Sequence, residues 1–176
     1  MSNKKFPRIY SLSTVGIRNH YNSDYRFHPF RTDFAGDSGV GKSIIADVLQ
    51  LILVGEREFK SATDSSSERE ARKLIIERYG YVFLNIAIDT DKFIVIGMYI
   101  STTSIDPFII QANIGLDVFE PLSSPLISKD FMLGDEIIDI TNLPERMKEN
   151  KQAYAAKLSL NKYHELLEQN KILPID

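Results

Sequence analysis

The stretch Gly36-Asp37-Ser38-Gly39-Val40-Gly41-Lys42-Ser43 is the most informative part of this sequence. It fits the pattern G-x-x-x-x-G-K-[ST], whose glycines permit the positive φ angles that a tight phosphate-binding turn requires. Successive backbone N–H groups of such a turn point inward and form a nest for an anion. We therefore expect residues 36–43 to bind the phosphates of a nucleotide.

The segment after this loop has the pattern of an amphipathic helix. Between residues 43 and 54 apolar side chains recur at helical spacing, and Gly55 is placed to end the helix. The positive end of the helix would then face the phosphates. In such a site Lys42 neutralises the β- and γ-phosphates, as the expected catalytic residue, and the Ser43 hydroxyl binds Mg²⁺. The expected nucleotide site comprises Gly36, Asp37, Ser38, Gly39, Val40, Gly41, Lys42, Ser43 and Ile44.

Strands are predicted before the phosphate loop. Residues 8–17 alternate loosely between apolar and polar side chains, which is typical of a strand. Residues 19–24 are rich in Asn, Ser and Asp and predict a turn. Residues 25–34 alternate aromatic and polar side chains and predict one or two short strands, interrupted at Pro29.

A meander of strands is predicted after the loop and its helix. A polar loop over residues 61–67 and a short helix over residues 69–76 come first. The turn-forming run 89–92 then separates two strongly apolar stretches, which is the pattern of a hairpin. The predicted strands cover residues 81–88, 93–100 and 107–114.

The pattern weakens beyond residue 117. We expect a strand over residues 133–140, helices over 143–147 and 163–170, and a loop over 149–152. The whole chain is expected to form a single domain of the α/β class, a P-loop NTPase lobe with an antiparallel or mixed β-sheet around the phosphate loop and its helix. Its expected parts are the N-terminal strands (1–35), the loop and helix (36–55), the polar loop, helix and meander (56–116), and a mixed segment (117–176).

Composition excludes several classes of protein. The 176 residues are 43% hydrophobic and 26% charged, which is ordinary globular usage. No cysteine is present, so disulfides and thiolate zinc sites are excluded, and the composition suits a reducing compartment. The charged N-terminus has no apolar run behind it, and the longest apolar stretch is far shorter than a membrane helix needs. We expect a cytoplasmic protein that does not enter a membrane.

Two groups of P-loop proteins resemble the loop. Small GTPases often carry the same string of eight residues, but they also need D-x-x-G after the loop and N-K-x-D to recognise guanine. Here the D-x-x-G match, residues 33–36, precedes the end of the loop. The nearest matches to N-K-x-D, residues 161–164 and 170–173, both lack the aspartate that would accept hydrogen bonds from guanine.

The second resemblance is to the N-terminal lobe of ATPase heads of the SMC, RecF and RecN group, which are ABC-type ATPases. The helix after the loop, residues 43–53 with Asp47, is similar to the S-x-x-x-D-A-[IL] helix of those heads. Residues 72–76, then Gly80 and the hairpin 81–100, follow in the family's order. The resemblance covers about the first 115 residues. It implies that ATP and Mg²⁺ are the cofactors.

The same resemblance implies that part of the catalytic machinery lies elsewhere. The S-G-G signature of such heads is absent from this sequence. The strand that ends in Asp-Glu is absent as well, because the candidate Asp89 is followed by Thr90 and not by Glu. ATP hydrolysis would then need a missing C-terminal lobe or a partner. The implied partners are a second copy or that complementary lobe, and DNA, in repair, chromosome maintenance or anti-phage defence. Gln111, at the end of an apolar run, is the candidate glutamine that binds Mg²⁺ and responds to the γ-phosphate; a plain polar residue on a strand is the alternative.

The sequence also allows other hypotheses about the function. The chain could be a GTPase-like protein or nucleotide kinase complete in itself, or a non-enzymatic interaction module with a vestigial loop. Arg26, His28 and Arg31 alternate along one predicted strand and could form a basic stripe for nucleic acid. Lys4, Lys5 and Arg8 could contact DNA phosphates, and a solvated charged terminus is the alternative for these three residues.

Overall fold

The computed structural model of this chain describes residues 6–17, 20–27, 52, 75, 78–102, 104–113, 115 and 119–169. The predicted phosphate loop, most of its helix, the polar loop 61–67 and all of the predicted helix 69–76 except Ile75 lie outside these residues. Ile75 forms an isolated β-bridge with Ile17, so at this residue the helix prediction is wrong.

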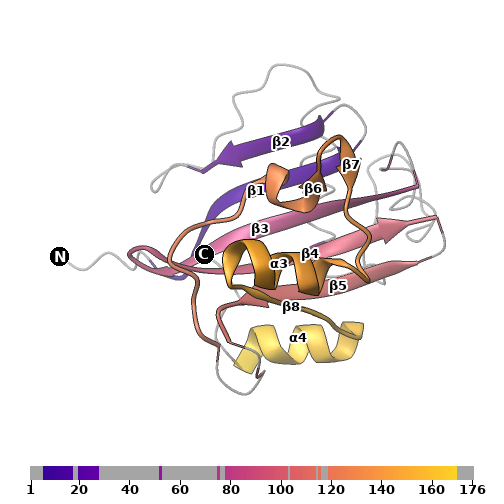
Figure 1. The fold of residues 1–176 in the computed structure, drawn as a ribbon. Coiled ribbons are helices and arrows are strands. Elements are labelled where there is room, and N and C mark those ends of the chain that lie inside the picture. Colours follow the sequence, from indigo (N-terminus) through magenta and orange to yellow (C-terminus); the bar gives the residue numbers. More distant parts are fainter. Residues whose placement is uncertain are drawn as a thin grey trace, which may run out of the picture.

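A six-stranded antiparallel sheet forms the centre of the described structure (Figure 1). The order of its strands is β2-β1-β3-β4-β5-β8, so most neighbours in the sheet are also neighbours in sequence. The central strands are rich in β-branched and aromatic residues and are buried on both faces. The strands are β1 (Arg8–Ile17), β2 (His20–Arg26), β3 (Tyr79–Asp89), β4 (Lys92–Ser101), β5 (Ile105–Gln111) and β8 (Tyr154–Lys157).

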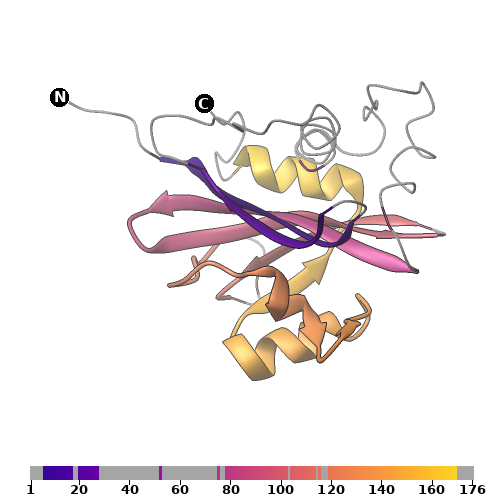
Figure 2. The same cartoon turned by 90° about the horizontal axis from the view of Figure 1, so that it is seen from above.

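The two faces of the sheet are covered differently (Figure 2). Helix α4 (Leu160–Gln169) lies on one face. The opposite face is covered by the 3₁₀ helix η1 (Ser128–Phe131), the two-residue strands β6 (Met132–Leu133) and β7 (Glu136–Ile137), and helix α3 (Leu143–Lys151).

Each face has its own hydrophobic cluster. The cluster on the α4 side, which we call the α4-side cluster, contains Leu12, Ile17, Phe27, Ile52, Ile75, Val82, Leu84, Ile94, Ile96, Ile109, Tyr163, Leu166 and Leu167. The α3-side cluster contains Val15, Tyr81, Phe83, Val95, Phe108, Phe131, Leu143 and Met147. Successive side chains of a strand point to opposite faces, so each central strand contributes to both clusters.

Several sequence predictions agree with the structure. The first strand has the predicted bounds 8–17. The hairpin is confirmed, with β3 and β4 paired antiparallel through a register that runs from Tyr79 opposite Ser101 to Asp89 opposite Lys92. The third strand of the meander is β5, which pairs antiparallel with β4 but ends at Gln111.

Other predictions are wrong in detail. The turn predicted over residues 19–24 lies largely within β2, because pairing with β1 outweighs the low strand propensity of Asn22, Ser23 and Asp24. The strand predicted over residues 133–140 is instead the short hairpin β6–β7, which turns at Gly134 with a φ of 64°. The loop predicted over residues 149–152 is largely helical.

Helix α3 is longer than its predicted range because nothing in the sequence ends it earlier. Pro144 stands in its first turn, where a missing N–H costs nothing. The helix ends at Gln152, whose φ of 54° is left-handed and whose N–H donates to the Lys148 carbonyl oxygen at 3.2 Å. Strand β8, which the sequence pattern does not predict, pairs only four residues with β5.

The fold class predicted from the sequence is therefore established at its coarser level. The chain is a mixed α/β protein with an antiparallel sheet and helices on both faces. The finer prediction, a P-loop lobe built around residues 36–55, concerns residues outside those described.

Candidate functional site

The chain enters the predicted phosphate segment from the end of β2. Phe27, directly after that strand, donates its N–H to the Tyr10 carbonyl oxygen of β1 at 2.9 Å. Its side chain is only 4% exposed and belongs to the α4-side cluster. Phe27, which precedes the segment 28–51 that contains the predicted phosphate loop, is thus held by a backbone hydrogen bond and by packing in the core.

Ile52, which follows the segment 28–51, is held as firmly as Phe27. Ile52 has helical conformation, and its side chain is fully buried in the same α4-side cluster. Its carbonyl oxygen accepts a hydrogen bond of 2.7 Å from the Tyr163 hydroxyl of α4. Tyr163 is also fully buried, and burial raises the pKa of its phenol because a buried phenolate is not solvated. The hydroxyl therefore keeps its proton and donates.

Phe27 and Ile52, the residues that flank the segment 28–51, therefore both lie in the layer between the sheet and α4. A third point, Ile75, is buried in this cluster and forms an isolated bridge with Ile17 at the end of β1. The predicted site residues Gly36, Asp37, Ser38, Gly39, Val40, Gly41, Lys42, Ser43 and Ile44 lie outside the described residues. Their role as a phosphate site remains a prediction.

Gln111 is described, and its side chain is engaged with backbone groups. Its Nε2 donates to the Gly115 carbonyl oxygen at 2.7 Å, and its Oε1 accepts from the Glu120 N–H at 2.8 Å. The residue is 1% exposed at the end of β5. These bonds hold the chain that leaves β5 against the sheet. Because an amide oxygen has two lone pairs, a contact with Mg²⁺ would have to use the second one.

Asp89 takes the position that the turn prediction gives it. It is exposed at the β3–β4 turn, where its carboxylate accepts the Thr90 N–H at 2.7 Å. Asp91 follows with a φ of 55°, a left-handed conformation that aspartate tolerates better than most residues. Both carboxylates thus belong to a solvated hairpin turn.

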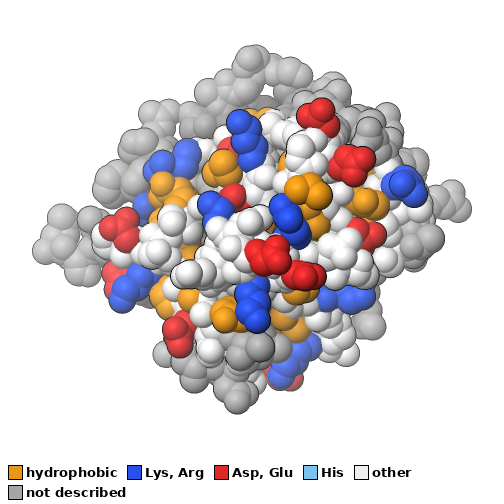
Figure 3. Space-filling model, in the orientation of Figure 1, with side chains coloured by type: hydrophobic (Ala, Val, Ile, Leu, Met, Phe, Trp, Pro, Cys, Tyr) orange, Lys and Arg blue, Asp and Glu red, His pale blue; other side chains and the backbone are white. Residues whose placement is uncertain are grey.

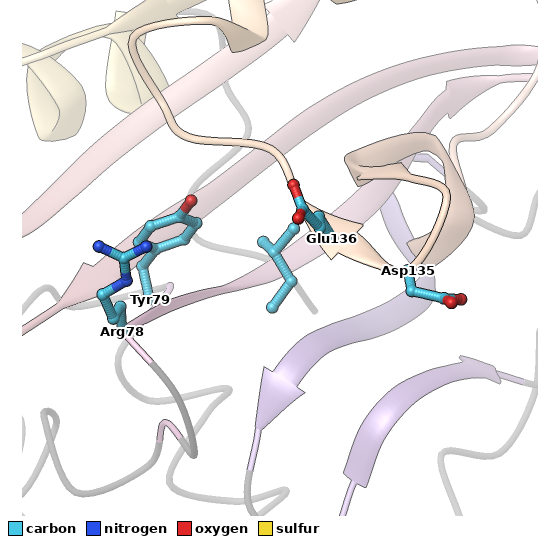
Figure 4. Close-up of a pocket in the computed structure, with 5 residues that line it drawn as sticks. Arg78, Tyr79, Asp135 and Glu136 are labelled. Atoms are coloured by element: carbon cyan, nitrogen blue, oxygen red, sulfur yellow. The ribbon is translucent and has the colours of Figure 1, made fainter.

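A pocket lined by described residues has a volume of about 390 Å³ (Figure 4). Arg78, which precedes β3, and Tyr79, the first residue of that strand, line one side of it. Asp135, Glu136 and Ile137, from the β6–β7 hairpin, line the other. In Figure 4 the Asp135 carboxylate points away from Arg78. These described lining residues include a cation and two carboxylates but no pair of a nucleophile and a base.

Tyrosines behind this pocket form a buried cluster. Tyr81 packs against the rings of Tyr99 and Phe131, with centroids 5.1 and 4.8 Å away. Its hydroxyl donates to the Ile138 carbonyl oxygen at 2.5 Å. Burial, together with the nearby Tyr99 and Asp139, raises the pKa of Tyr81 well above its ordinary value. The Tyr81 phenol is therefore a neutral donor that joins β3 to the segment before α3.

Two contacts could not be inferred from sequence. The Tyr163 hydroxyl meets a backbone oxygen 111 positions away, and nothing in the pattern of α4 names that partner. The guanidinium carbons of Arg8 and Arg26 lie 5.7 and 3.9 Å from the ring centroid of Tyr10. In the sequence, only the excess of cations near the N-terminus indicates that Arg8 and Arg26 could come together.

Comparison with known protein families finds no match, and no curated protein matches this sequence. Within the part of the chain that the structure describes, no group of three or more His, Asp or Glu side chains is arranged to hold a metal ion. None of the helices in that same part combines the length and apolar character that crossing a membrane requires.

Proposed function

We propose that this chain is the ATP·Mg²⁺-binding N-terminal lobe of an ATPase related to the SMC and RecF group, acting on DNA. The observation that carries the proposal is the string from Gly36 to Ser43 followed by an amphipathic helical pattern with Asp47. In this spacing, backbone amides and one ammonium group can bind the phosphates of a nucleoside triphosphate, and one hydroxyl can bind its magnesium ion.

The described structure supports the proposal through the anchors of that segment. Phe27 and Ile52 are both buried in the α4-side cluster, so the chain leaves and rejoins one face of the sheet. A rigid support at both ends favours a preorganised loop, because ordering a free loop on ligand binding would cost conformational entropy.

The roles of the individual residues follow from their chemistry. The amides of residues 36–43 would hold the phosphates, Lys42 would offset their charge, and Ser43 would be a ligand of Mg²⁺. A bound triphosphate then needs a carboxylate to orient the attacking water, and the sequence has no D-E strand end to provide one. We therefore propose that the chain alone binds ATP and hydrolyses it poorly or not at all. Hydrolysis would await a complementary lobe or a second copy.

Thermal unfolding with and without nucleotide tests this proposal. ATP·Mg²⁺ at about 100 times its Kd should stabilise the fold by about 2.7 kcal/mol. For a chain of this size that corresponds to a rise in melting temperature of roughly 5–11 °C. Lys42→Ala should lose most of this rise, whereas Lys162→Ala, on the exposed side of α4, should keep it.

Competition between nucleotides separates the alternatives. ATP should displace a fluorescent nucleotide more effectively than GTP does. Preference for GTP, or rapid hydrolysis by the purified chain, would favour a GTPase or nucleotide kinase complete in itself. No rise with either nucleotide, or an equal rise in Lys42→Ala, would leave a non-enzymatic interaction module with a vestigial loop.

A further inference from the structure

The N-terminal part of the chain is far more basic than the rest. The first 31 residues contain the cations Lys4, Lys5, Arg8, Arg18, Arg26 and Arg31 and a single carboxylate, Asp24, whereas the whole chain has a net charge of −3. Segregation of positive charge in one stretch is a common property of surfaces that bind polyanions.

Among the described residues, Asp24 forms no ion pair with Arg8 or Arg26. Its carboxylate accepts hydrogen bonds from the Ser13 hydroxyl, from the Ser128 N–H at 2.9 Å and from the Ser128 hydroxyl at 2.8 Å. These bonds join β2 to β1 and to η1. The carboxylate is therefore occupied with structural partners.

Arg8 and Arg26 come together on one ring. Arg26, in β2, is opposite Ser11 of β1, and its guanidinium carbon lies 3.9 Å from the Tyr10 ring centroid. The guanidinium carbon of Arg8 lies 5.7 Å from the same centroid. The ring of Tyr10 is itself held by an edge contact with Phe93, with centroids 4.8 Å apart. Two cations are thus positioned by one aromatic side chain.

Neither guanidinium has an anionic partner among the described residues. The ion pairs there do not involve Arg8 or Arg26, and the turn carboxylates Asp89 and Asp91 do not pair with them. One nitrogen of Arg8, Nη1, is buried without a hydrogen-bond acceptor. Two neighbouring cations repel, so an incoming anion that contacts the accessible part of the two guanidinium groups would relieve that repulsion.

The place of this cluster suits a long polyanion. Strand β2 is at the edge of the described sheet, beside β1. In Figure 3, several Lys and Arg side chains lie at the upper left of the face, where Figure 1 shows the end of β2. Guanidinium groups bind phosphate oxygens through parallel N–H donors, and a nucleic acid presents phosphates in close succession.

We propose that Arg8 and Arg26, positioned by Tyr10 at the β1–β2 edge, bind the phosphate backbone of a nucleic acid. Because guanidinium groups and Phe93 already contact the Tyr10 ring, it is not a platform for stacking bases. Binding is therefore electrostatic and independent of base sequence. The inference takes its partner from the proposed function and assigns that partner a surface, but it requires no nucleotide in the phosphate loop.

Fluorescence anisotropy with a labelled DNA duplex, without ATP, tests the proposal between about 50 and 200 mM salt. Each guanidinium that contacts a phosphate should add about 0.9 to the slope of log affinity against log salt. Arg26→Gln should reduce the slope by about 1 and the affinity roughly five- to tenfold at about 0.1 M salt. The double variant Arg8→Gln/Arg26→Gln should roughly double the loss of slope.

The control is Lys162→Gln, which removes one positive charge from α4 on the other face of the sheet. It should leave the slope unchanged, and Arg26→Lys should restore most of the slope lost in Arg26→Gln because the charge remains. Arg26 is exposed, so its variants keep the test valid if changes at the half-buried Arg8 impair folding.

Three results would overturn the proposal. They are absence of salt-dependent DNA binding by the wild-type chain, an unchanged slope in a folded Arg26→Gln variant, and binding to anionic phosphatidylserine vesicles in place of DNA. The assay also separates this inference from the nucleotide site, because Lys42→Ala should bind DNA as the wild type does. Loss of ATP binding would not alter this result.

Discussion

The hydrogen bond between Tyr163 and Ile52 leads to the sharpest prediction about stability. The substitution Tyr163→Phe removes one hydroxyl and leaves the ring in place. The Ile52 carbonyl oxygen then loses the donor that now lies 2.7 Å away. Both residues are fully buried, so water has no access to replace the bond.

The size of the effect follows from this burial. An unsatisfied buried acceptor costs about 1–3 kcal/mol, and no cavity term adds to it because the phenyl ring still fills its space. For a chain of about this length, 1 kcal/mol shifts the melting temperature by about 2–4 °C. We therefore expect Tyr163→Phe to melt about 2–12 °C below the wild type.

Urea denaturation monitored by circular dichroism measures the free energy directly, and the slope with urea should not change because the same surface is exposed on unfolding. Tyr154→Phe is the matched control. Tyr154 is half-buried in β8, so the loss of its hydroxyl should change the free energy of unfolding by less than about 0.5 kcal/mol. If the two variants are equally stable, the assignment of a stabilising bond from α4 to Ile52 is refuted.

Three further results are expected. Burial raises the pKa of Tyr81 and Tyr163 above the ordinary 10.0, so above that pH the folded state keeps protons that the unfolded chain loses. The free energy of unfolding should therefore be undiminished below pH 10 and should fall above pH 10 by about 1.4 kcal/mol per pH unit for each phenol. Urea titrations at several pH values measure this fall. Asn85→Ala should cost about 2–5 kcal/mol in the same titrations, because it leaves the buried N–H and C=O of Leu126 without the amide that bonds both. Gly97→Ala should lower the melting temperature, since its Cβ would lie 2.4 Å from the Val82 carbonyl oxygen, an overpacking that costs about 1–3 kcal/mol.

The central strands could be predicted because their signal is local. Residues 81–100 consist of two apolar, β-branched and aromatic runs around a turn-forming run, and each property acts within a few residues. The structure accordingly has the hairpin β3–β4 with the predicted turn. The end of α3 was harder to predict, because it depends on Gln152 adopting a left-handed φ that many residues could adopt.

Predictions failed where pairing partners decide the conformation. Residues 20–26 have polar, turn-forming composition, yet they form β2 because they pair with the backbone of β1 along most of its length. Strand β8 is only four residues long and is defined by its pairing with β5. Short segments of this kind have too little local preference to predict, since their stability comes from contacts made across the sheet.

In the candidate site, too, the local features could be predicted from the sequence and the long-range contacts could not. The spacing of glycines, Lys42 and Ser43 predicts phosphate chemistry by itself, because an anion nest and its metal ligand are built from consecutive residues. The anchoring of that segment could not be predicted. Phe27 and Ile52 share one cluster, and Tyr163 reaches Ile52, through contacts between residues far apart in the chain.

The sequence alone thus determined the candidate phosphate loop, the strand runs that flank the β3–β4 turn, and the basic character of the first 31 residues. Only the tertiary structure decided which face of the sheet receives Phe27 and Ile52, and that Arg8 and Arg26 share the ring of Tyr10. The reason is physical: turn chemistry, periodicity and charge act over a few residues, whereas burial and side-chain partners depend on how the sheet brings distant segments together.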